Sequence, residues 1–403
     1  MINIGRNLIN TPRKVAPVST LFGNASIIEL VKTAIVYKAS QNDFVLSKGD
    51  SMTKYSYKMF GKELTNAVIE NTGGLIFTAG PTIKTLINDV DKLYTDKGIW
   101  SAGNYVLEGI ERDCPDTFDD ARDYLVETMD RCTGDRPYCS LAIKLTGLGH
   151  MEMFRIYHRA QHLLLREMFR NHSVSHLDGR MVLTRDGIKE FLNSKNIEFT
   201  STEIDEFFGI AKFDDSKYGS DEIGEIEFYE NVHAHYVNSD NHNSAIIKRI
   251  CASVGLKKNT RLAIERFQKR ALDIVETAAK YDTKLLIDAE QTYIQKALDS
   301  FTRQLQTMYH RDRPAFILNG YQSYLKSSPF HIAREIERCK TIGIGAGVKL
   351  IRGAYMEEER QIARENHYPS PVWDTIEETH ISYDKNVARL LKNLDPEKGK
   401  PPP

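Results

Sequence analysis

The sequence predicts an α/β fold with a parallel sheet, of the (β/α)8 TIM-barrel type. Short β-like runs alternate with helical patterns in the later part of the chain, and this order of elements produces parallel strands. Most runs are apolar on both faces, as a sheet covered by helices requires. Four of the runs also carry one polar side chain late in the strand, where a barrel places its binding and catalytic groups.

Five runs are predicted to be strands. They are the segments 98–109, 138–149, 284–291, 314–325 and 347–355. Helical patterns lie between the last three, in TYIQKALDSFTRQLQTMYH and SPFHIAREIERCK. We therefore expect an N-terminal helical arm and the first barrel strands in residues 29–166, and βα units that carry a binding site in residues 281–394.

One long segment, residues 167–280, interrupts the alternation. Its part FDDSKYGSDEIGEIEFYENV can be aligned with the loop of an EF-hand, the helix–loop–helix calcium motif. Positions 1, 3, 5, 6, 8 and 12 of that loop would be Gly219, Asp221, Ile223, Gly224, Ile226 and Glu230. Two ligand positions then lack side-chain oxygens. We therefore expect a degenerate, EF-hand-like helical insertion, and favour a structural pair over a calcium site.

Composition excludes several classes of protein. The 403 residues carry a formal net charge of −1, which argues against a nucleic-acid partner. The cysteines form no C-x-x-C pair, which favours a reducing compartment. No apolar run approaches the roughly 20 residues of a membrane-spanning helix, so any membrane association would be peripheral.

The two ends of the chain differ from its middle. Residues 1–28 contain no acidic side chain but include Arg6, Arg13 and Lys14. This bias favours a mitochondrial targeting segment over a short tail that lacks acids by chance. Residues 395–403, which end in KGKPPP, are predicted to be a disordered tail.

Alternation along the last predicted strand, GVKLIRGAY, separates two cations. Lys349, Ile351 and Gly353 share one face, whereas Arg352 lies on the other. Arg352 is near the end of the strand and can reach solvent. Lys349 is deeper and needs an anionic or dipolar partner, because an unpaired buried cation is costly.

The same alternation places Lys144, Asp288 and Gln322 late in three other strands. A single buried Lys or Asp is more often half of a structural ion pair. Four strands that each contribute such a group favour a site instead. Two lysines facing Asp288 and Glu290 would suit an anionic substrate or cofactor.

The end of GVKLIRGAY contributes small residues and a ring. Gly353 and Ala354 remove side-chain bulk, which would let the backbone approach a flat ligand closely. Tyr355 adds an aromatic ring and a hydroxyl beside it.

The segment GIGAGV, residues 343–348, looks like a dinucleotide-binding fingerprint but fails as one. Its third glycine position is Val348, and the segment precedes a strand rather than following one. The sequence has no Walker A motif and no H-E-x-x-H zinc motif. A Rossmann nicotinamide site is therefore not expected, and no metal site is predicted.

Four motifs in order, AIKLTGLG, LLIDAEQTY, GYQSYLK and VKLIRGAYMEEER, resemble the mitochondrial proline dehydrogenase (proline oxidase) family. IFTAG and GIWSAGNYVLEG fit its N-terminal region, and the insertion interrupts the match. The resemblance implies a distorted (β/α)8 barrel that binds FAD at its C-terminal mouth. It also implies oxidation of L-proline to Δ1-pyrroline-5-carboxylate, with electrons passed to ubiquinone on the matrix side of the mitochondrial inner membrane.

The resemblance assigns roles residue by residue. Lys349 matches the basic residue beside flavin N5, which stabilises negative charge on the reduced ring. Lys144 matches a lysine that holds the proline carboxylate, Asp288 the active-site aspartate and Tyr355 a tyrosine near the substrate. The other cofactor-binding residues that it implies are Gln322, Ile351, Gly353, Ala354 and, near the phosphate–adenine end, Thr379.

The sequence departs from the family pattern after Leu394. The family continues with further βα units and a helix of the form R-R-x-x-E, whose arginines clamp the proline carboxylate. No such pair follows here, so the resemblance predicts a C-terminally truncated barrel with weakened catalysis. Proline dehydrogenase, hydroxyproline dehydrogenase and a catalytically inactive family member all stay open, as does a calcium-responsive module built on the insertion.

Overall fold

The computed structural model describes most of the chain. The described residues are 27–69, 78–80, 82–105, 107, 110–176, 179–212, 221–233 and 244–394. Most of the predicted targeting segment and the predicted C-terminal tail lie outside them. The chain forms two compact units, namely Met1–Gly103 with Arg131–Cys139, and Asn104–Asp130 with Ser140–Pro403.

The smaller unit is helical in its described part. Its helices are α2 (Ile27–Ser40), α3 (Asp43–Phe60), α4 (Lys62–Ile69) and α6 (Ile83–Lys97). Asp91 of α6 ties the segment Arg131–Cys139 to that helix, because it accepts hydrogen bonds from Arg136 Nε at 2.7 Å and Tyr138 Oη at 2.8 Å. The bond from Arg136 lowers the pKa of Asp91, and the Tyr138 ring stacks on Tyr94 at 3.8 Å between centroids.

A parallel sheet positions the site in the larger unit. Its strands, in spatial order, are β2 (Cys139–Ile143), β6 (Leu285–Ile287), β7 (Ile317–Gln322) and β8 (Val348–Ile351), and β1 (Ser101–Tyr105) belongs to the same sheet. The spatial order follows the chain order without the reversal that defines a doubly wound sheet. The predicted barrel-like α/β class is therefore confirmed, and each predicted strand contains an observed one.

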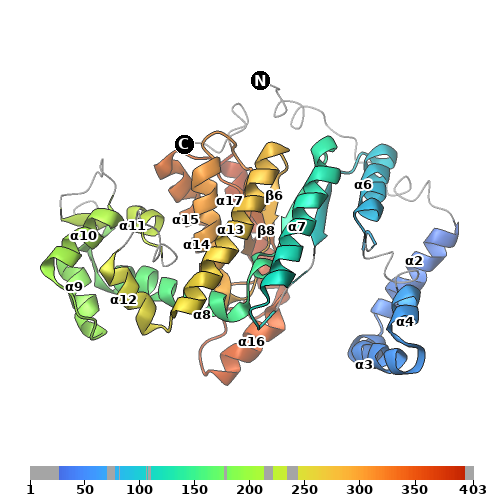
Figure 1. The fold of residues 1–403 in the computed structure, drawn as a ribbon, viewed down its shortest axis with the longest axis horizontal. Coiled ribbons are helices and arrows are strands. Elements are labelled where there is room, and N and C mark those ends of the chain that lie inside the picture. The colour runs from blue at the N-terminus through green and yellow to red at the C-terminus, as the bar shows by residue number, and fades with distance from the viewer. Residues whose placement is uncertain are drawn as a thin grey trace. The chain divides into compact units, whose positions relative to one another are not determined.

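Helices alternate with these strands along the chain or follow the last of them. They are α7 (Pro115–Arg131), α8 (Met151–His162), the π-helical turns η4 (Leu163–Arg170), α13 (Lys258–Lys280), α14 (Thr292–Tyr309), α15 (Ser328–Ile342), α16 (Met356–Glu365) and α17 (Ile376–Lys392). Figure 1 shows α13, α14 and α15 side by side, with β6 and β8 behind them. Apolar side chains of strands and helices share one core, in which the Phe267 ring contacts Phe154 and Phe301 at 5.0 and 4.8 Å between centroids.

The insertion contains a small sheet that the sequence analysis did not foresee. Its antiparallel strands are β3 (Ser173–Ser175), β4 (Met181–Thr184) and β5 (Glu222–Gly224), and its helices are α9 (Arg185–Ser194), α10 (Ser201–Ala211), α11 (Glu225–Asn231) and α12 (Ala245–Ser253). Strands of three or four residues are too short to show a period in the sequence. The apolar side chains of the insertion join the barrel core, so the two fold as one unit.

The EF-hand alignment proposed from the sequence is wrong in register. Gly224 lies in β5, pairs with Val182 and caps α11 with an ordinary φ of −70°, whereas the sixth position of the loop needs a sharp glycine turn. Glu230, aligned with the last ligand, is instead paired with Arg338, and Gly219, aligned with the first position, lies outside the described residues. Among the described residues, no group of three or more His, Cys, Asp or Glu side chains could hold a metal ion.

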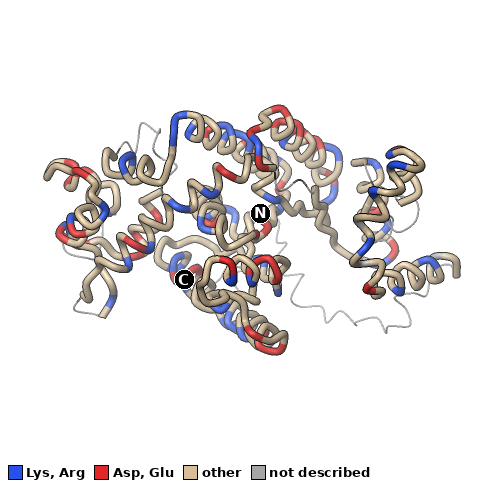
Figure 2. Tube along the Cα trace, turned by 90° about the horizontal axis from the view of Figure 1, so that it is seen from below, with Lys and Arg blue, Asp and Glu red and all other residues tan. Residues whose placement is uncertain are grey.

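Both signs of charge are interspersed along the described helices, as Figure 2 shows. None of the described helices is long and apolar enough to cross a membrane.

We expect the larger unit to lose stability as the pH falls from about 6.5 to about 4. His233 is buried between Ser300 Oγ at 2.5 Å and the Glu230 carbonyl at 2.8 Å, and burial lowers its pKa to about 4. In the unfolded chain the pKa of a histidine is near 6.5, so the unfolded state binds more protons than the folded state in this window. The stabilising contribution of neutral, buried His233 is therefore complete above pH 6.5 and lost towards pH 4.

The loss from this histidine is roughly 3 kcal/mol. Urea unfolding at pH 7.5, 5.5 and 4.5 measures it, and His233→Asn should make the pH dependence shallower by that amount. An unchanged pH dependence in the variant would contradict the assignment.

Candidate functional site

The candidate site lies where the parallel strands end. Lys144 directly follows β2, Asp288 directly follows β6, and Gln322 is the last residue of β7. The Asp288 amide donates to the Ile143 carbonyl at 2.9 Å, so the ends of β2 and β6 are level. The carboxyl ends of parallel strands meet at one edge of the sheet, which is the edge that binds ligands in such folds.

Lys349 of β8 forms an ion pair with Asp288. Both side chains are largely but not fully buried, with 23% and 16% of their surface exposed. The neighbouring Leu350 points the other way and packs with Tyr321 and Ile336 under the helices. Strand alternation thus placed Lys349 on the correct face, and its anionic partner in this structure is the Asp288 carboxylate.

Lys144 contacts Tyr355, the residue that precedes α16. The Lys144 ammonium donates to the Tyr355 hydroxyl at 3.2 Å and lies 5.8 Å from the ring centroid. The segments after β2 and β8 are therefore bridged by a cation and a phenol. Sequence analysis selected both residues, but their contact joins positions 211 apart in the sequence and appears only in the folded chain.

Gln322 joins three of the strand ends. Its Nε2 donates to the Glu290 carbonyl at 2.8 Å, and its Oε1 accepts from the Ala354 amide at 3.5 Å. Ile351 pairs with Gln322 in the β7–β8 register. The side-chain amide therefore ties the segment after β6 to the segment after β8.

Two residues of this network were missed from the sequence. The Glu290 carboxylate is buried and accepts from Thr146 Oγ1 at 2.7 Å, while its backbone amide donates to Gln295 Oε1 at 2.7 Å. Thr146 and Gln295 lie in or beside the conspicuous motifs at uncharged positions. Only their closeness to Glu290 in the folded chain identifies them as members of this network.

Gly353 is required by a side chain as well as by its backbone. Its φ is +140°, and a Cβ there would lie 1.3 Å from Cδ1 of Tyr324, whose ring is fully buried. Sequence analysis attributed this glycine to close approach of a flat ligand. In the structure, the Tyr324 ring fills the space on that side, and Ala354 is the exposed neighbour.

Two other residues lie on or against α17. Arg352 Nε contacts His380 Nδ1 at 3.1 Å, and its guanidinium lies 4.2 Å from the centroid of the Tyr383 ring, as expected for the face opposite Lys349. Thr379 is buried, and its hydroxyl donates to the Thr375 carbonyl at 3.4 Å within the helix. The structure thus joins Lys349 to Asp288, Lys144 to Tyr355 and Gln322 to Ala354, whereas the polar contact of Thr379 is internal to α17.

Comparison with known proteins shows which sequences this chain resembles. The family model described as proline dehydrogenase matches residues 200–399. "Proline dehydrogenase 1, mitochondrial" of Caenorhabditis elegans is 24% identical over 355 residues, which are 83% of this chain and 55% of that protein. The Drosophila melanogaster protein of the same name is 36% identical over 126 residues, which are 31% of this chain and 18% of that protein.

A relative with a different name also matches. The hydroxyproline dehydrogenase of Xenopus laevis is 31% identical over 139 residues, which are 34% of this chain and 29% of that protein. The chain therefore spans between 18% and 55% of the lengths of these three relatives.

A solved structure supports the fold class. Proline utilization A from Bdellovibrio bacteriovorus, inactivated by N-propargylglycine, has a TM-score of 0.52 and 13% identity over 89% of this chain and 30% of its own. At this identity the likeness concerns the fold alone. The family model covers β6, β7 and β8, at or near whose ends Asp288, Gln322 and Lys349 lie, and residues 200–399 belong to the proline dehydrogenase family.

Proposed function

We propose that the chain forms the site of an FAD-dependent proline dehydrogenase, which oxidises L-proline to Δ1-pyrroline-5-carboxylate. The observation that supports this most directly is Lys349, a cation held by Asp288 at the ends of the strands. A second cation, Lys144, lies at the same edge beside Tyr355. One cation is suited to a cofactor that becomes negative on reduction and the other to a substrate carboxylate.

The residues present fit a flavin. Lys349 supplies the charge, Gln322 a fixed amide dipole, and Ala354 an exposed backbone with little side chain. The chemistry that FAD supplies when bound is acceptance of the hydride that leaves proline. Residues that would hold FAD are Lys349, Gln322, Ile351, Gly353, Ala354 and Thr379.

The chain's own residues would stabilise charge and orient the substrate. Asp288 keeps the Lys349 ammonium at one place, so little reorganisation is needed when negative charge develops nearby. Lys144 would bind the proline carboxylate, and the Tyr355 hydroxyl fixes the position of that ammonium. Orientation by such contacts lowers the entropic cost of reaching the reactive geometry.

The same proposal includes the location and the electron acceptor. Relatives with matching segments are named as mitochondrial proteins, which supports a mitochondrial location for this chain. The matrix side of the inner membrane, peripheral association with it, and ubiquinone as acceptor follow from the family resemblance.

The test is the colour and reduction of the purified chain. We expect the chain to bind FAD, and L-proline to bleach the flavin absorbance in the absence of oxygen. A folded chain that takes up no FAD under saturating conditions would overturn the proposal.

Hydroxyproline dehydrogenase is the second candidate, because the Xenopus laevis relative carries that name. Parallel reduction experiments with L-proline and trans-4-hydroxy-L-proline distinguish the two. Reduction at least about tenfold faster by hydroxyproline, a difference of about 1.4 kcal/mol, would favour the second candidate.

We expect Lys144→Ala to weaken proline binding more than it slows the chemical step. Loss of a charge-assisted hydrogen bond is worth about 1.5–3 kcal/mol, so KM for proline should rise roughly 10–100-fold with a small change in kcat. Lys326→Ala is the matched control, because Lys326 pairs with Asp374 at the surface. Equal KM values for the two variants would remove Lys144 from the substrate site.

A further inference from the structure

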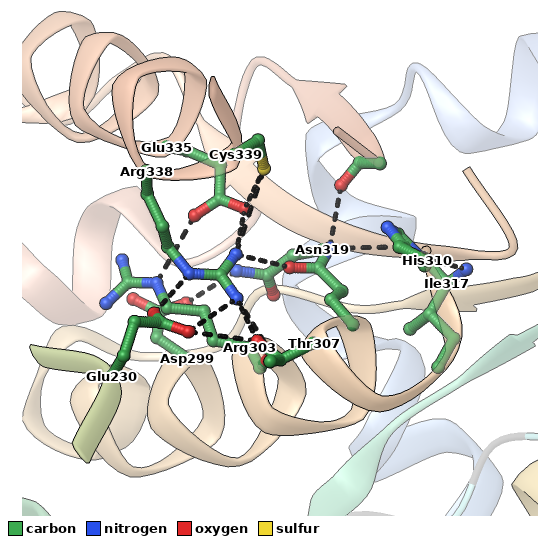
Figure 3. Close-up of polar contacts among 12 residues, drawn as sticks. Glu230, Asp299, Arg303, Thr307, His310, Ile317, Asn319, Glu335, Arg338 and Cys339 are labelled. Carbon is green, nitrogen blue, oxygen red and sulfur yellow. Dashed lines mark hydrogen bonds and ion pairs between the residues drawn. The ribbon is translucent and has the colours of Figure 1, made fainter. Parts of the chain in front are cut away.

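A buried polar cluster, drawn in Figure 3, contacts the first residue of β7 and the segment just before β8. Asp288 and Gln322 lie at the opposite ends of their strands. The cluster combines a residue of the insertion with residues of two barrel helices. Glu230 comes from α11, Arg303, Gln306, Thr307 and His310 from α14 and its end, and Glu335 and Arg338 from α15.

Arg338 is the centre of this cluster. Figure 3 shows its guanidinium between Glu230 and Glu335. Its Nε pairs with Glu230, and its Nη1 donates to Glu335 at 2.8 Å. The Glu230 carboxylate also accepts from Thr307 Oγ1 at 2.9 Å. The insertion thus contributes one of the two carboxylates that pair with Arg338, and a buried charge is costly to leave unpaired.

Arg338 also orients Gln306. Its Nη1 donates to Gln306 Oε1 at 3.3 Å, which leaves the Nε2 group directed at the sheet. That group donates to the carbonyls of Ile317 and Gly347, each at 3.1 Å. Ile317 is the first residue of β7, and Gly347 immediately precedes β8. One buried amide therefore holds the starts of both strands together.

His310, one helical turn further on, binds the same two segments. Its Nε2 accepts from the Ile317 amide at 2.9 Å, and its Nδ1 lies 2.6 Å from the Gly345 carbonyl. These partners require the neutral tautomer with hydrogen on Nδ1. The segment before β8 is thus held by two side chains four residues apart, one in the last turn of α14 and one at its C-cap.

The start of β8 has little freedom to move. A Cβ on Gly347 would lie 2.2 Å from the Ile317 carbonyl oxygen, so the backbone before β8 is already in close contact with the start of β7. β8 has only four residues, and Lys349 is the second of them. A shift of Gly347 therefore reaches Lys349 with no intervening loop to absorb it.

We propose that Glu230, Arg338 and Gln306 are positioning residues through which the insertion sets the place of β8 and of its Lys349. Glu230 holds Arg338, Arg338 orients Gln306, and Gln306 holds the first residues of the strand. The insertion then helps to position a residue of the site, Lys349. The effect on catalysis rests on the proposed function, whereas the effect on β8 does not.

A second ion pair between the same helices provides a matched control. Glu225 of α11 pairs with Arg334 of α15, with about a fifth of each side chain exposed. Arg334 lies over the rings of Tyr229 and Phe330. The Glu225→Gln variant thus removes a charge from the same helix, facing the same partner helix, outside the pathway to Gln306.

Hydrogen exchange tests the proposal in the full chain. In Glu230→Gln, amide protection in peptides spanning residues 345–353 should fall at least about tenfold, with protection in α13 retained. Gln306→Leu should reproduce this local loss, because it removes the amide that Arg338 orients towards the strands but removes no charge. Glu225→Gln should leave the protection of β8 within about twofold of the wild type.

Flavin reduction gives the second readout. In Glu230→Gln the rate of reduction by L-proline should fall about tenfold while KM stays within about twofold, as for a displaced Lys349. Equal loss of protection throughout the unit, or unchanged protection of β8 in both Glu230→Gln and Gln306→Leu, would overturn the proposal. If the wild type takes up no FAD, the proposed function fails, and the exchange experiment still decides the positioning role.

Discussion

Lys349→Met is expected to slow flavin reduction by L-proline by about 100-fold or more, with FAD still bound. Methionine keeps most of the side-chain length but removes the charge that the reduced ring would face. Removing one preorganised electrostatic partner commonly costs 10²–10³ in rate. Anaerobic stopped-flow measurement of flavin bleaching gives the rate, and the spectrum of the oxidised protein reports whether cofactor remains.

The ion pair with Asp288 supplies the control for this result. Asp288→Asn leaves the Lys349 charge in place but loosens its position, so the rate should fall by a smaller factor than in Lys349→Met. Lys340→Met, in which the altered lysine contacts Asn393 at the surface, should change nothing. A wild-type rate in Lys349→Met with FAD bound would show that the lysine only pairs with Asp288.

Gly353→Ala is expected to destabilise the larger unit by about 3 kcal/mol or more. The new methyl group would collide with the buried Tyr324 ring in a backbone conformation that alanine avoids, and overpacking and strain of this kind each cost about 1–3 kcal/mol. Urea or thermal unfolding measures the loss. The spacing between β7 and the segment after β8 should change as well, so FAD affinity should fall.

Gly343→Ala separates strain from collision. Gly343 also has a positive φ, +69°, but a Cβ at this position would meet no other atom within 4 Å. Replacing Gly343 by alanine should lower the free energy of unfolding by only about 1 kcal/mol. If the two variants are equally stable, the Tyr324 ring adapts to the methyl group, and the close contact does not explain why residue 353 is glycine.

The strands could be predicted because local sequence dictates their pattern. Runs such as LLI and VKLI are apolar on alternate or successive positions, and the period of two assigns Lys349 and Leu350 to opposite faces wherever the strand lies. The packing of the partly buried Leu350 against Tyr321 and Ile336 and the pairing of Lys349 with Asp288 agree with that assignment.

The insertion was predicted less well, for a physical reason. Three strands of three or four residues leave no readable period. The EF-hand alignment was chosen because it puts a glycine, Gly224, at the sixth position of the loop. In the structure, Gly224 pairs with Val182 and therefore lies in a strand. Such pairings join residues far apart in sequence and cannot be read from either segment alone.

The sequence by itself determined the α/β class, the strands, the residues of the strand ends and the family resemblance, since these depend on local pattern. Only the tertiary structure decided the partners: Asp288 for Lys349, Tyr355 for Lys144, the Tyr324 ring for Gly353, and Arg338 for Glu230. Each of these contacts joins residues 29 to 211 positions apart or lies across packed elements. Local propensity carries no information about such contacts, because they form only when the sheet and its helices pack.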